Sequence, residues 1–140
     1  MNNDQMMKEI LLSAKTIASV GLSSNPAKES YGIVQYLKDQ GYRMVPVNPT
    51  ASEIMGEKVY PDLSSIPEKV DVVQVFRKPE DVPPVVDDAI KVGAKVVWMQ
   101  EGIVNEEAAQ KARDAGVQVV MDACMRATNR RLIGPKLLNL

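Results

Sequence analysis

The stretch Ala18-Ser19-Val20-Gly21-Leu22-Ser23-Ser24-Asn25-Pro26 decides the fold, because in it an apolar segment passes through a turn of small residues into a helix. Residues 16–20 predict a buried strand, and residues 28–40 predict an amphipathic helix. At the helix N-terminus, free backbone N–H groups and the helix dipole favour an anion. Gly21 lets the backbone approach a ligand closely. The turn alone is equally consistent with a phosphate site and with a connection that binds nothing.

Length and composition predict one domain over residues 1–140, with a core large enough to fold without disulfides or metals. The 17 Lys and Arg residues are balanced by 18 Asp and Glu residues, and no basic stripe appears, which argues against nucleic acid as a partner. No apolar run is long enough to cross a membrane, and the one cysteine, Cys124, cannot form an internal disulfide. These features predict a cytoplasmic protein.

Five Val-rich runs alternate with helical segments along the chain. The runs cover residues 16–20, 43–47, 70–76, 94–99 and 117–121. Continuous apolar runs of this length are typical of strands that are covered on both faces, as in a parallel sheet. With right-handed crossovers they predict an α/β fold, a Rossmann-like doubly wound sheet whose strand order is 3-2-1-4-5 when the strands are numbered along the chain.

Several helix boundaries are marked in the sequence. A leading helix is expected over residues 5–14. Pro83 and Pro84 fit the first turn of a helix that begins near Asp81, because first-turn N–H groups have no intrahelical partner. Asn105 is expected to cap the next helix. The crossover over residues 49–69 is expected to be irregular, with one short helical turn.

Ligands of doubly wound sheets bind beyond the carboxyl ends of the strands, beside strand 1. This rule selects the Gly21 turn and the segments 48–50, 76–79, 100–102 and 122–125. It excludes Arg43, which opens the second strand and should therefore lie at the opposite end of the sheet, more than about 10 Å away.

The residues at this edge favour one kind of nucleotide. Asn48 and Pro49 stand where a dinucleotide-binding domain would place an acid to hold the ribose hydroxyls, and the turn lacks two glycines of the dinucleotide fingerprint. Both features disfavour NAD, and the missing acid also suits a ribose with a 3′-phosphate, as in coenzyme A. Lys28, Arg77 and Lys78 are the cations placed to meet phosphates, with solvated surface charge as the alternative for each.

Four segments in order resemble the small stand-alone CoA-binding domain family. They are V-G-L-S-S-N-P at 20–26, V-P-V-N-P at 45–49, V-F-R-K-P-E at 75–80 and V-V-W-M-Q-E-G at 96–102. The likeness runs from about residue 8 to residue 132, and the family's fold resembles the CoA-binding domain of the succinyl-CoA synthetase α subunit. The resemblance implies a protein that binds CoA or an acyl-CoA.

The resemblance also implies three groups of ligand contacts. The pyrophosphate would be held by Gly21, Leu22, Ser23 and Ser24. The nucleotide and its phosphate would be contacted by Asn48, Pro49, Phe76 and Arg77. The pantetheine arm would be lined by Gln100, Glu101 and Gly102. The chain departs from the family pattern after the last strand, with Ala123 in place of an arginine and Thr128-Asn129 in place of a Glu-His pair.

Catalysis by this chain alone is not expected. The absence of histidine excludes His-dependent relays and imidazole metal ligands, and a zinc site built almost wholly from carboxylates is rare. Glu101 is the one ligand-edge carboxylate that could act as a base, but no nucleophile accompanies it. Cys124 is expected to be a packed small side chain, with a reactive thiol as the alternative.

Three functions therefore remain open. The first is a CoA-binding protein without catalysis of its own, because the fold alone does not imply ligase activity. The second is a CoA-dependent enzyme subunit whose partner supplies the catalytic groups. The third is a domain that binds NAD(P) or another nucleotide. A partner protein or a homo-oligomer is compatible with each.

Overall fold

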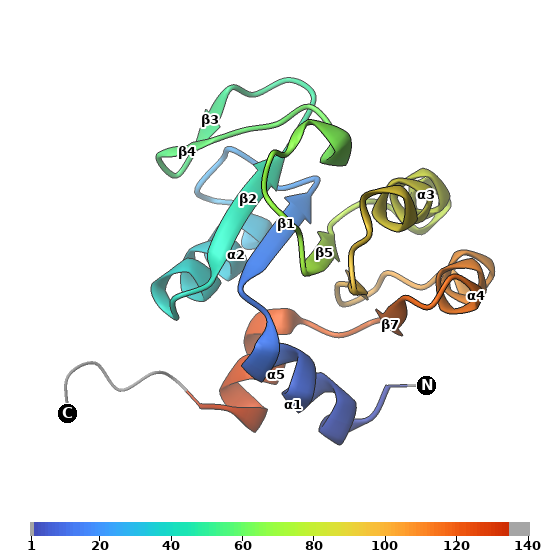
Figure 1. Ribbon diagram of the computed structural model, residues 1–140. Coiled ribbons are helices and arrows are strands. Elements are labelled where there is room, and N and C mark those ends of the chain that lie inside the picture. Colours follow the sequence, from blue (N-terminus) through green and yellow to red (C-terminus); the bar gives the residue numbers. More distant parts are fainter. Residues whose placement is uncertain (1, 135–140) are drawn as a thin grey trace.

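A five-stranded parallel sheet organises the computed structural model, which describes residues 2–134 (Figure 1). In spatial order its strands are β2 (Arg43–Val47), β1 (Thr16–Val20), β5 (Val72–Val75), β6 (Val96–Met99) and β7 (Gln118–Val120). Every neighbouring pair is parallel. The strands are buried on both faces, which explains their continuous apolar character. The expected Rossmann-like α/β class is confirmed.

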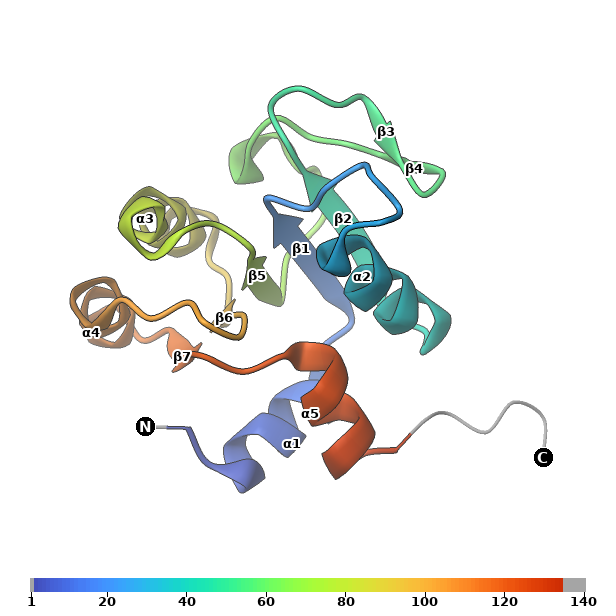
Figure 2. The same ribbon diagram turned by 180° about the vertical axis from the view of Figure 1, so that it is seen from behind.

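Helices cover both faces of the sheet (Figures 1 and 2). One face packs against α1 (Asp4–Ser13), α2 (Glu29–Asp39) and α5 (Met125–Leu132). The other face packs against α3 (Val82–Val92), α4 (Glu106–Asp114) and the 3-10 helix η1 (Leu63–Ser65). Strand side chains alternate between the two cores, so that Trp98 packs toward the first group of helices and Val97 toward the second.

The observed strand order corrects the expected one. Numbered along the chain, the five strands lie in the order 2-1-3-4-5, because β5 pairs with β1 and not with β2. Pro46 in the middle of β2 accounts for this. It has no N–H to donate, and its carbonyl oxygen accepts a bond from the Tyr60 N–H on the side away from β1. A strand with an interior proline can pair fully on one side only, so β2 lies at the edge of the sheet.

The crossover between β2 and β5 is irregular, as expected, but it contains a small hairpin that the sequence analysis did not anticipate. Strands β3 (Glu53–Ile54) and β4 (Glu57–Lys58) pair antiparallel across a turn formed by Met55 and Gly56, both with positive φ. Two successive positive φ values are typical of tight hairpin turns. The expected short helical turn is η1.

Helix α3 carries its prolines in the first turn, after a short 3-10 turn η2 (Pro79–Asp81). The Asn105 side chain caps α4 by accepting a bond from the Ala108 N–H at 2.9 Å. Both boundaries agree with expectation. Helix α5 had no counterpart in the sequence analysis. Among residues 2–134, none of the helices has both the length and the apolar character needed to cross a membrane.

The switch point of the sheet lies between β1 and β5. The chain leaving β1 enters α2 on one face, whereas the chain leaving β5 enters α3 on the opposite face. In doubly wound sheets, connections that diverge in this way form a ligand-binding crevice beyond the carboxyl ends of the two strands. The candidate site expected beside β1 therefore has β5, and not β2 alone, as its neighbour.

Candidate functional site

The Gly21 turn and Arg77 meet at this crevice. Gly21 has a φ of 89°, which disfavours other residues, and its N–H donates to the Val47 carbonyl at 3.1 Å. A Cβ atom at this position would lie 3.3 Å from Arg77 Cδ and 3.3 Å from the Phe76 carbonyl carbon. The absence of a side chain at residue 21 therefore lets the Arg77 side chain lie directly against the turn.

The loop from Leu22 to Lys28 is shaped by its own polar groups. Leu22 is fully buried and anchors the loop. The Ser23 N–H donates to Ser30 Oγ, and Ser23 Oγ accepts from the Asn25 N–H. Ser24 is exposed. Lys28, the N-cap residue of α2, makes no side-chain capping bond, so the first N–H groups of the helix have no side-chain acceptor there.

Asn48 ties the loop after β2 to the loop after β1. Its Nδ2 donates to the Leu22 carbonyl at 3.1 Å, and its Oδ1 accepts from the Thr50 N–H, the Thr50 hydroxyl and the Ala51 N–H. These bonds fix the wall of the crevice. Pro49 is exposed beside it. The Asn48 amide is thus engaged within the protein. A contact between Asn48 and a nucleotide stays a prediction.

A cavity of about 300 Å³ opens beside Arg77, between the ends of β1 and β2 and the start of α3. Its lining includes Leu63, Arg77, Asp81, Val85 and Asp88. Arg77 is half-buried and forms no ion pair with any described carboxylate. The cavity thus combines an apolar wall, carboxylate acceptors and one free guanidinium.

Phe76 and Lys78 flank Arg77 but have different surroundings. Phe76 is half-buried against the core under α1, α2 and α5. Lys78 is exposed and precedes η2 as its N-cap residue. Arg77 is therefore the member of this segment that lines the cavity.

A buried chain of polar side chains crosses the sheet just below the crevice. Ser19 Oγ donates to Gln74 Oε1 at 2.7 Å, and Gln74 Nε2 donates to Gln100 Oε1 at 3.1 Å. Gln100 Oε1 also accepts from the Met125 N–H at the start of α5. Gln100 is 4% exposed, so this expected pantetheine contact lies beneath the ligand edge and anchors α5 instead. A contact between its backbone and a ligand stays untested.

The loop after β6 is exposed at the same edge. Glu101 and Gly102 are both exposed, and Gly102 has a φ of 83°. The Gly102 N–H donates to Asp122 Oδ1 at 2.6 Å, which joins this loop to the one after β7. Cys124 stands at the N-cap of α5 as a free, half-buried thiol, so it is less enclosed than a core side chain.

Arg126 is a cation of this edge that the sequence analysis missed. It lies in the first turn of α5, is half-buried, and places Nη1 3.4 Å from the position of a Cβ on Gly32 in α2. The one weak signal for it in the sequence is a basic residue two positions after Cys124, at a ligand-edge segment. The contact of Arg126 with α2 depends on how α5 packs against α2, which the sequence does not show locally.

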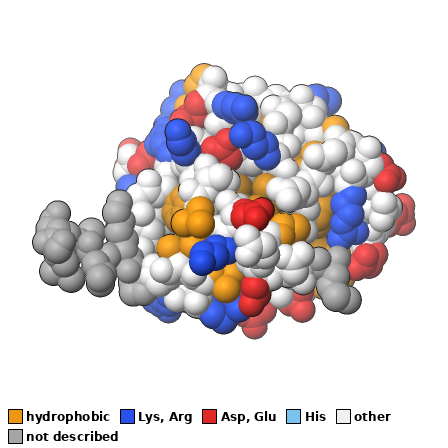
Figure 3. All heavy atoms as spheres, turned by 60° about the horizontal axis from the view of Figure 1, so that its bottom comes forward, with side chains coloured by type: hydrophobic (Ala, Val, Ile, Leu, Met, Phe, Trp, Pro, Cys, Tyr) orange, Lys and Arg blue, Asp and Glu red, His pale blue; other side chains and the backbone are white. Residues whose placement is uncertain are grey.

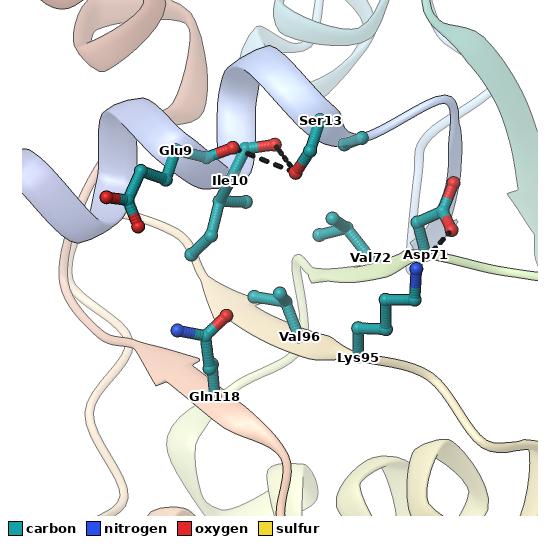
Figure 4. A pocket seen from close by; sticks show the side chains of 9 residues that line it. Glu9, Ile10, Ser13, Asp71, Val72, Lys95, Val96 and Gln118 are labelled. Carbon is teal, nitrogen blue, oxygen red and sulfur yellow. Dashed lines mark hydrogen bonds and ion pairs between the residues drawn. The ribbon is translucent and has the colours of Figure 1, made fainter.

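A second cavity, of about 200 Å³, lies at the opposite edge of the sheet (Figure 4). Ile10, Val72 and Val96 form its apolar floor. Asp71 Oδ2 accepts from the N–H groups of Lys15 and Thr16, and Ser13 Oγ donates to the Glu9 carbonyl. Asp71 and Ser13 are thus engaged within the protein, and Lys95, the cation of this cavity, lies 4.0 Å from the Asp71 carboxylate, unlike the free cations of the carboxyl edge.

Apolar side chains also reach the surface on the face of α1 and α5. Figure 3 shows them in orange between charged groups. Leu12 is 64% exposed and Ile133 is 38% exposed, and both line a hollow between the ends of these helices. In the part of the chain that the structure describes, no cluster of acidic, cysteine or histidine side chains could hold a metal ion.

The parallel sheet, with helices on both faces and a switch point between β1 and β5, defines a Rossmann-like α/β domain. The comparisons make this class specific. The chain belongs to the CoA binding domain family, whose model matches residues 15–130. The family expected from the four sequence segments is confirmed.

The relatives include free-standing and larger proteins. "Uncharacterized protein YneT" of Bacillus subtilis is 41% identical over 123 residues, which are 88% of this chain and 91% of that protein. A hypothetical protein from Pyrococcus horikoshii OT3 has a TM-score of 0.92 and 42% identity, with 95% of this chain and 94% of that chain covered. The α subunit of ADP-forming acetate–CoA ligase I from Pyrococcus furiosus is 29% identical over 96% of this chain, which spans 30% of that subunit.

Proposed function

We propose that the protein binds coenzyme A, or an acyl-CoA, in the crevice between β1 and β5, without catalysing a reaction on its own. The observation that carries the proposal is the contact of Gly21 with Arg77. Because residue 21 has no Cβ, the Arg77 side chain lies directly against the turn that leads into α2, whose first N–H groups have no side-chain cap. A free guanidinium and uncapped N–H groups both favour a phosphate. The residues present therefore fit the ligand for which the family is described.

The cavity beside Arg77 suits the adenosine end of the ligand. Its apolar lining, with Leu63 and Val85, can pack against a purine ring, and the carboxylates of Asp81 and Asp88 can accept bonds from an amino group. Arg77 stands between this cavity and the Gly21 turn. We assign to Arg77 and Lys78 the 3′-phosphate, and to the turn the pyrophosphate.

Thermal unfolding with added ligands tests the assignment. A ligand that binds only the folded state raises the melting temperature by mass action. CoA should raise it more than dephospho-CoA, and NAD should have little effect. Equal shifts for CoA and dephospho-CoA would remove the 3′-phosphate argument. A larger shift with NAD would favour a dinucleotide-binding domain instead.

Removing the Arg77 side chain tests its role directly. Arg77→Ala should weaken CoA binding by about 1–3 kcal/mol, the usual range for a charge-assisted hydrogen bond. Arg131→Ala is the matched control, because it removes the same charge from a residue paired with Asp4 at the far end of α5. Calorimetry that finds equal CoA affinity for both variants would contradict the assignment.

The second candidate function is a subunit of a CoA-dependent enzyme. It is favoured by the similarity to the ligase α subunit, of which this chain spans only part. A partner protein would then supply the catalytic groups. Turnover of an acyl-CoA by the purified chain, or its co-purification with such a partner, distinguishes an enzyme or enzyme subunit from a free-standing binding protein.

A further inference from the structure

Helices α2 and α5 lie side by side and run in the same direction. Arg126 of α5 lies over Gly32 of α2, and Arg130, one turn later, stacks on the ring of Tyr36, one turn after Gly32, at 4.8 Å. The Tyr36 hydroxyl also donates to Asn129 Oδ1 at 2.9 Å. Both helices therefore begin at the carboxyl edge of the sheet. Arg126 belongs to the first turn of α5, and its side chain packs against the first turn of α2 at Gly32.

The position of Arg126 is electrostatically unfavourable without an anion. The N-terminus of a helix carries a partial positive charge, so a cation in the first turn is repelled. Arg130 and Arg131 lie in the last turn of α5, where cations are stabilising. Arg126 has no ion pair with a carboxylate of residues 2–134, and this includes Glu29 in the facing turn of α2.

Gly32 leaves room for Arg126 over the first turn of α2. A Cβ at this residue would lie 3.4 Å from Arg126 Nη1, which is an ordinary contact. The Nη1 atom of Arg126 occupies the space that a longer side chain at residue 32 would take. Arg126 thus lies in an unfavourable field over the first turn of α2, the helix that follows the loop carrying Ser23 and Ser24.

We infer that Arg126 is a second anion-binding side chain of the CoA site and that it contacts the pyrophosphate from the side opposite Arg77. Arg77 reaches the Gly21 turn from the face of α3, and Arg126 reaches the start of α2 from the face of α5. A pyrophosphate at the start of α2 offsets the repulsion between Arg126 and the two helix dipoles. This inference rests on the proposed CoA site and adds a residue to it.

Calorimetric titration with CoA and with dephospho-CoA tests the inference. Arg126→Ala should weaken both ligands by the same factor, about tenfold or more, because both contain the pyrophosphate. Arg126→Lys should recover part of the loss. Arg130→Ala is the matched control, since it removes the next arginine on the same side of α5 and should stay within about twofold of wild type.

A cycle with Gly32 separates a ligand contact from a folding defect. Gly32→Leu should weaken CoA binding by displacing the guanidinium, without lowering helix propensity. In the Arg126→Ala background the same change should cost nothing further, because the group that it displaces is already gone. Independent, additive losses would contradict the inference.

The remaining outcomes are also decisive. A wild-type protein that does not bind CoA would refute the proposed function itself. Wild-type affinity in folded Arg126→Ala protein would refute only the role of Arg126. A loss confined to CoA, with dephospho-CoA unaffected, would move Arg126 to the 3′-phosphate and overturn the pyrophosphate contact.

Discussion

Among the described residues, charged residues are paired at the amino edge of the sheet, whereas cations at its carboxyl edge are not. At the amino edge, Asp71 accepts two backbone N–H bonds and lies 4.0 Å from Lys95, while Arg43 pairs with Glu57 and Glu68. At the carboxyl edge, the described structure gives no ion pair to Arg77, to Arg126, or to the lysines at 28 and 78. Charges that partner one another stabilise the fold, whereas free cations beside helix N-termini are available to an anionic ligand.

The glycines of the two edges differ in the same way. Gly116, which ends α4 near the amino edge, has a φ of 84° and open space where a Cβ would stand. Gly21 has a φ of 89° and is enclosed by Phe76 and Arg77. The first glycine serves the backbone alone, and the second also makes room at the site. Substitutions at the two edges should therefore have separable effects on stability and on binding.

The largest expected effect is that of Gly21→Val. The branched side chain would push Arg77 away from the turn and strain the turn to which we assign the pyrophosphate, and CoA affinity should fall by at least about 100-fold. Gly116→Val is the control, because it imposes similar backbone strain of about 1–3 kcal/mol without an enclosing neighbour. Titration calorimetry on folded protein measures both. Unchanged affinity in Gly21→Val would place the phosphate site elsewhere.

Asp71→Ala should have the next largest effect, and on stability only. It leaves the N–H groups of Lys15 and Thr16 without their acceptor, which should lower the free energy of unfolding by about 1–3 kcal/mol. Asp87→Ala is the matched control, since it breaks the exposed pair with Lys111 and should cost less than about 1 kcal/mol. Urea unfolding measures both variants. A loss of CoA affinity in Asp71→Ala would show that the edges are coupled.

Most of the fold could be predicted from the sequence because its signals are local. Continuous Val-rich runs indicate buried strands, and Asn105 caps a helix through its own side chain. Strand order is not local, and the general rule for doubly wound sheets gave the wrong neighbour for β5. Pro46 carried the missing information, since an interior proline places its strand at an edge.

The site was predicted in the same uneven way. The ligand-edge rule placed the Gly21 turn and Arg77 at the same edge of the sheet, but the expected strand order put another strand between them, so their direct contact could not be derived from it. Arg126 depends on the packing of α5 along α2, and Gln100 depends on pairing with Gln74 inside the sheet. Neither contact has a periodic sequence signal. The ligand roles of the individual residues stay predictions until binding is measured.

Acid should lower the free energy of unfolding through Asp71 at the amino edge. Burial raises the pKa of Asp71, but the hydrogen bonds from Thr16 and Lys15, together with the charges of Lys95 and Lys69, more than offset this and hold the pKa below its ordinary value of 3.8. The contribution of the charged carboxylate is therefore present above pH 3.8 and is lost as the pH falls through the lowered pKa. The stability difference between wild type and Asp71→Asn should shrink over that range in urea unfolding. A difference that stays constant down to about pH 2 would contradict the assignment.

The smallest expected effect is that of Arg43→Met. The hydrogen bonds of Arg43 to Glu68 and Glu57 raise its pKa, yet the side chain is 45% exposed and water screens both pairs. We expect a loss of at most about 1 kcal/mol in the free energy of unfolding, and less in high salt. CoA affinity should be unchanged, because Arg43 opens β2 at the end opposite the Gly21 turn. Unfolding and CoA binding are each measured at increasing salt for the variant and the wild type. Salt should reduce the difference in unfolding free energy between the two proteins. The ratio of their CoA affinities should stay at about one throughout. A CoA affinity that falls with Arg43→Met as it does with Arg77→Ala would show that net charge, and not position at the carboxyl edge, governs binding.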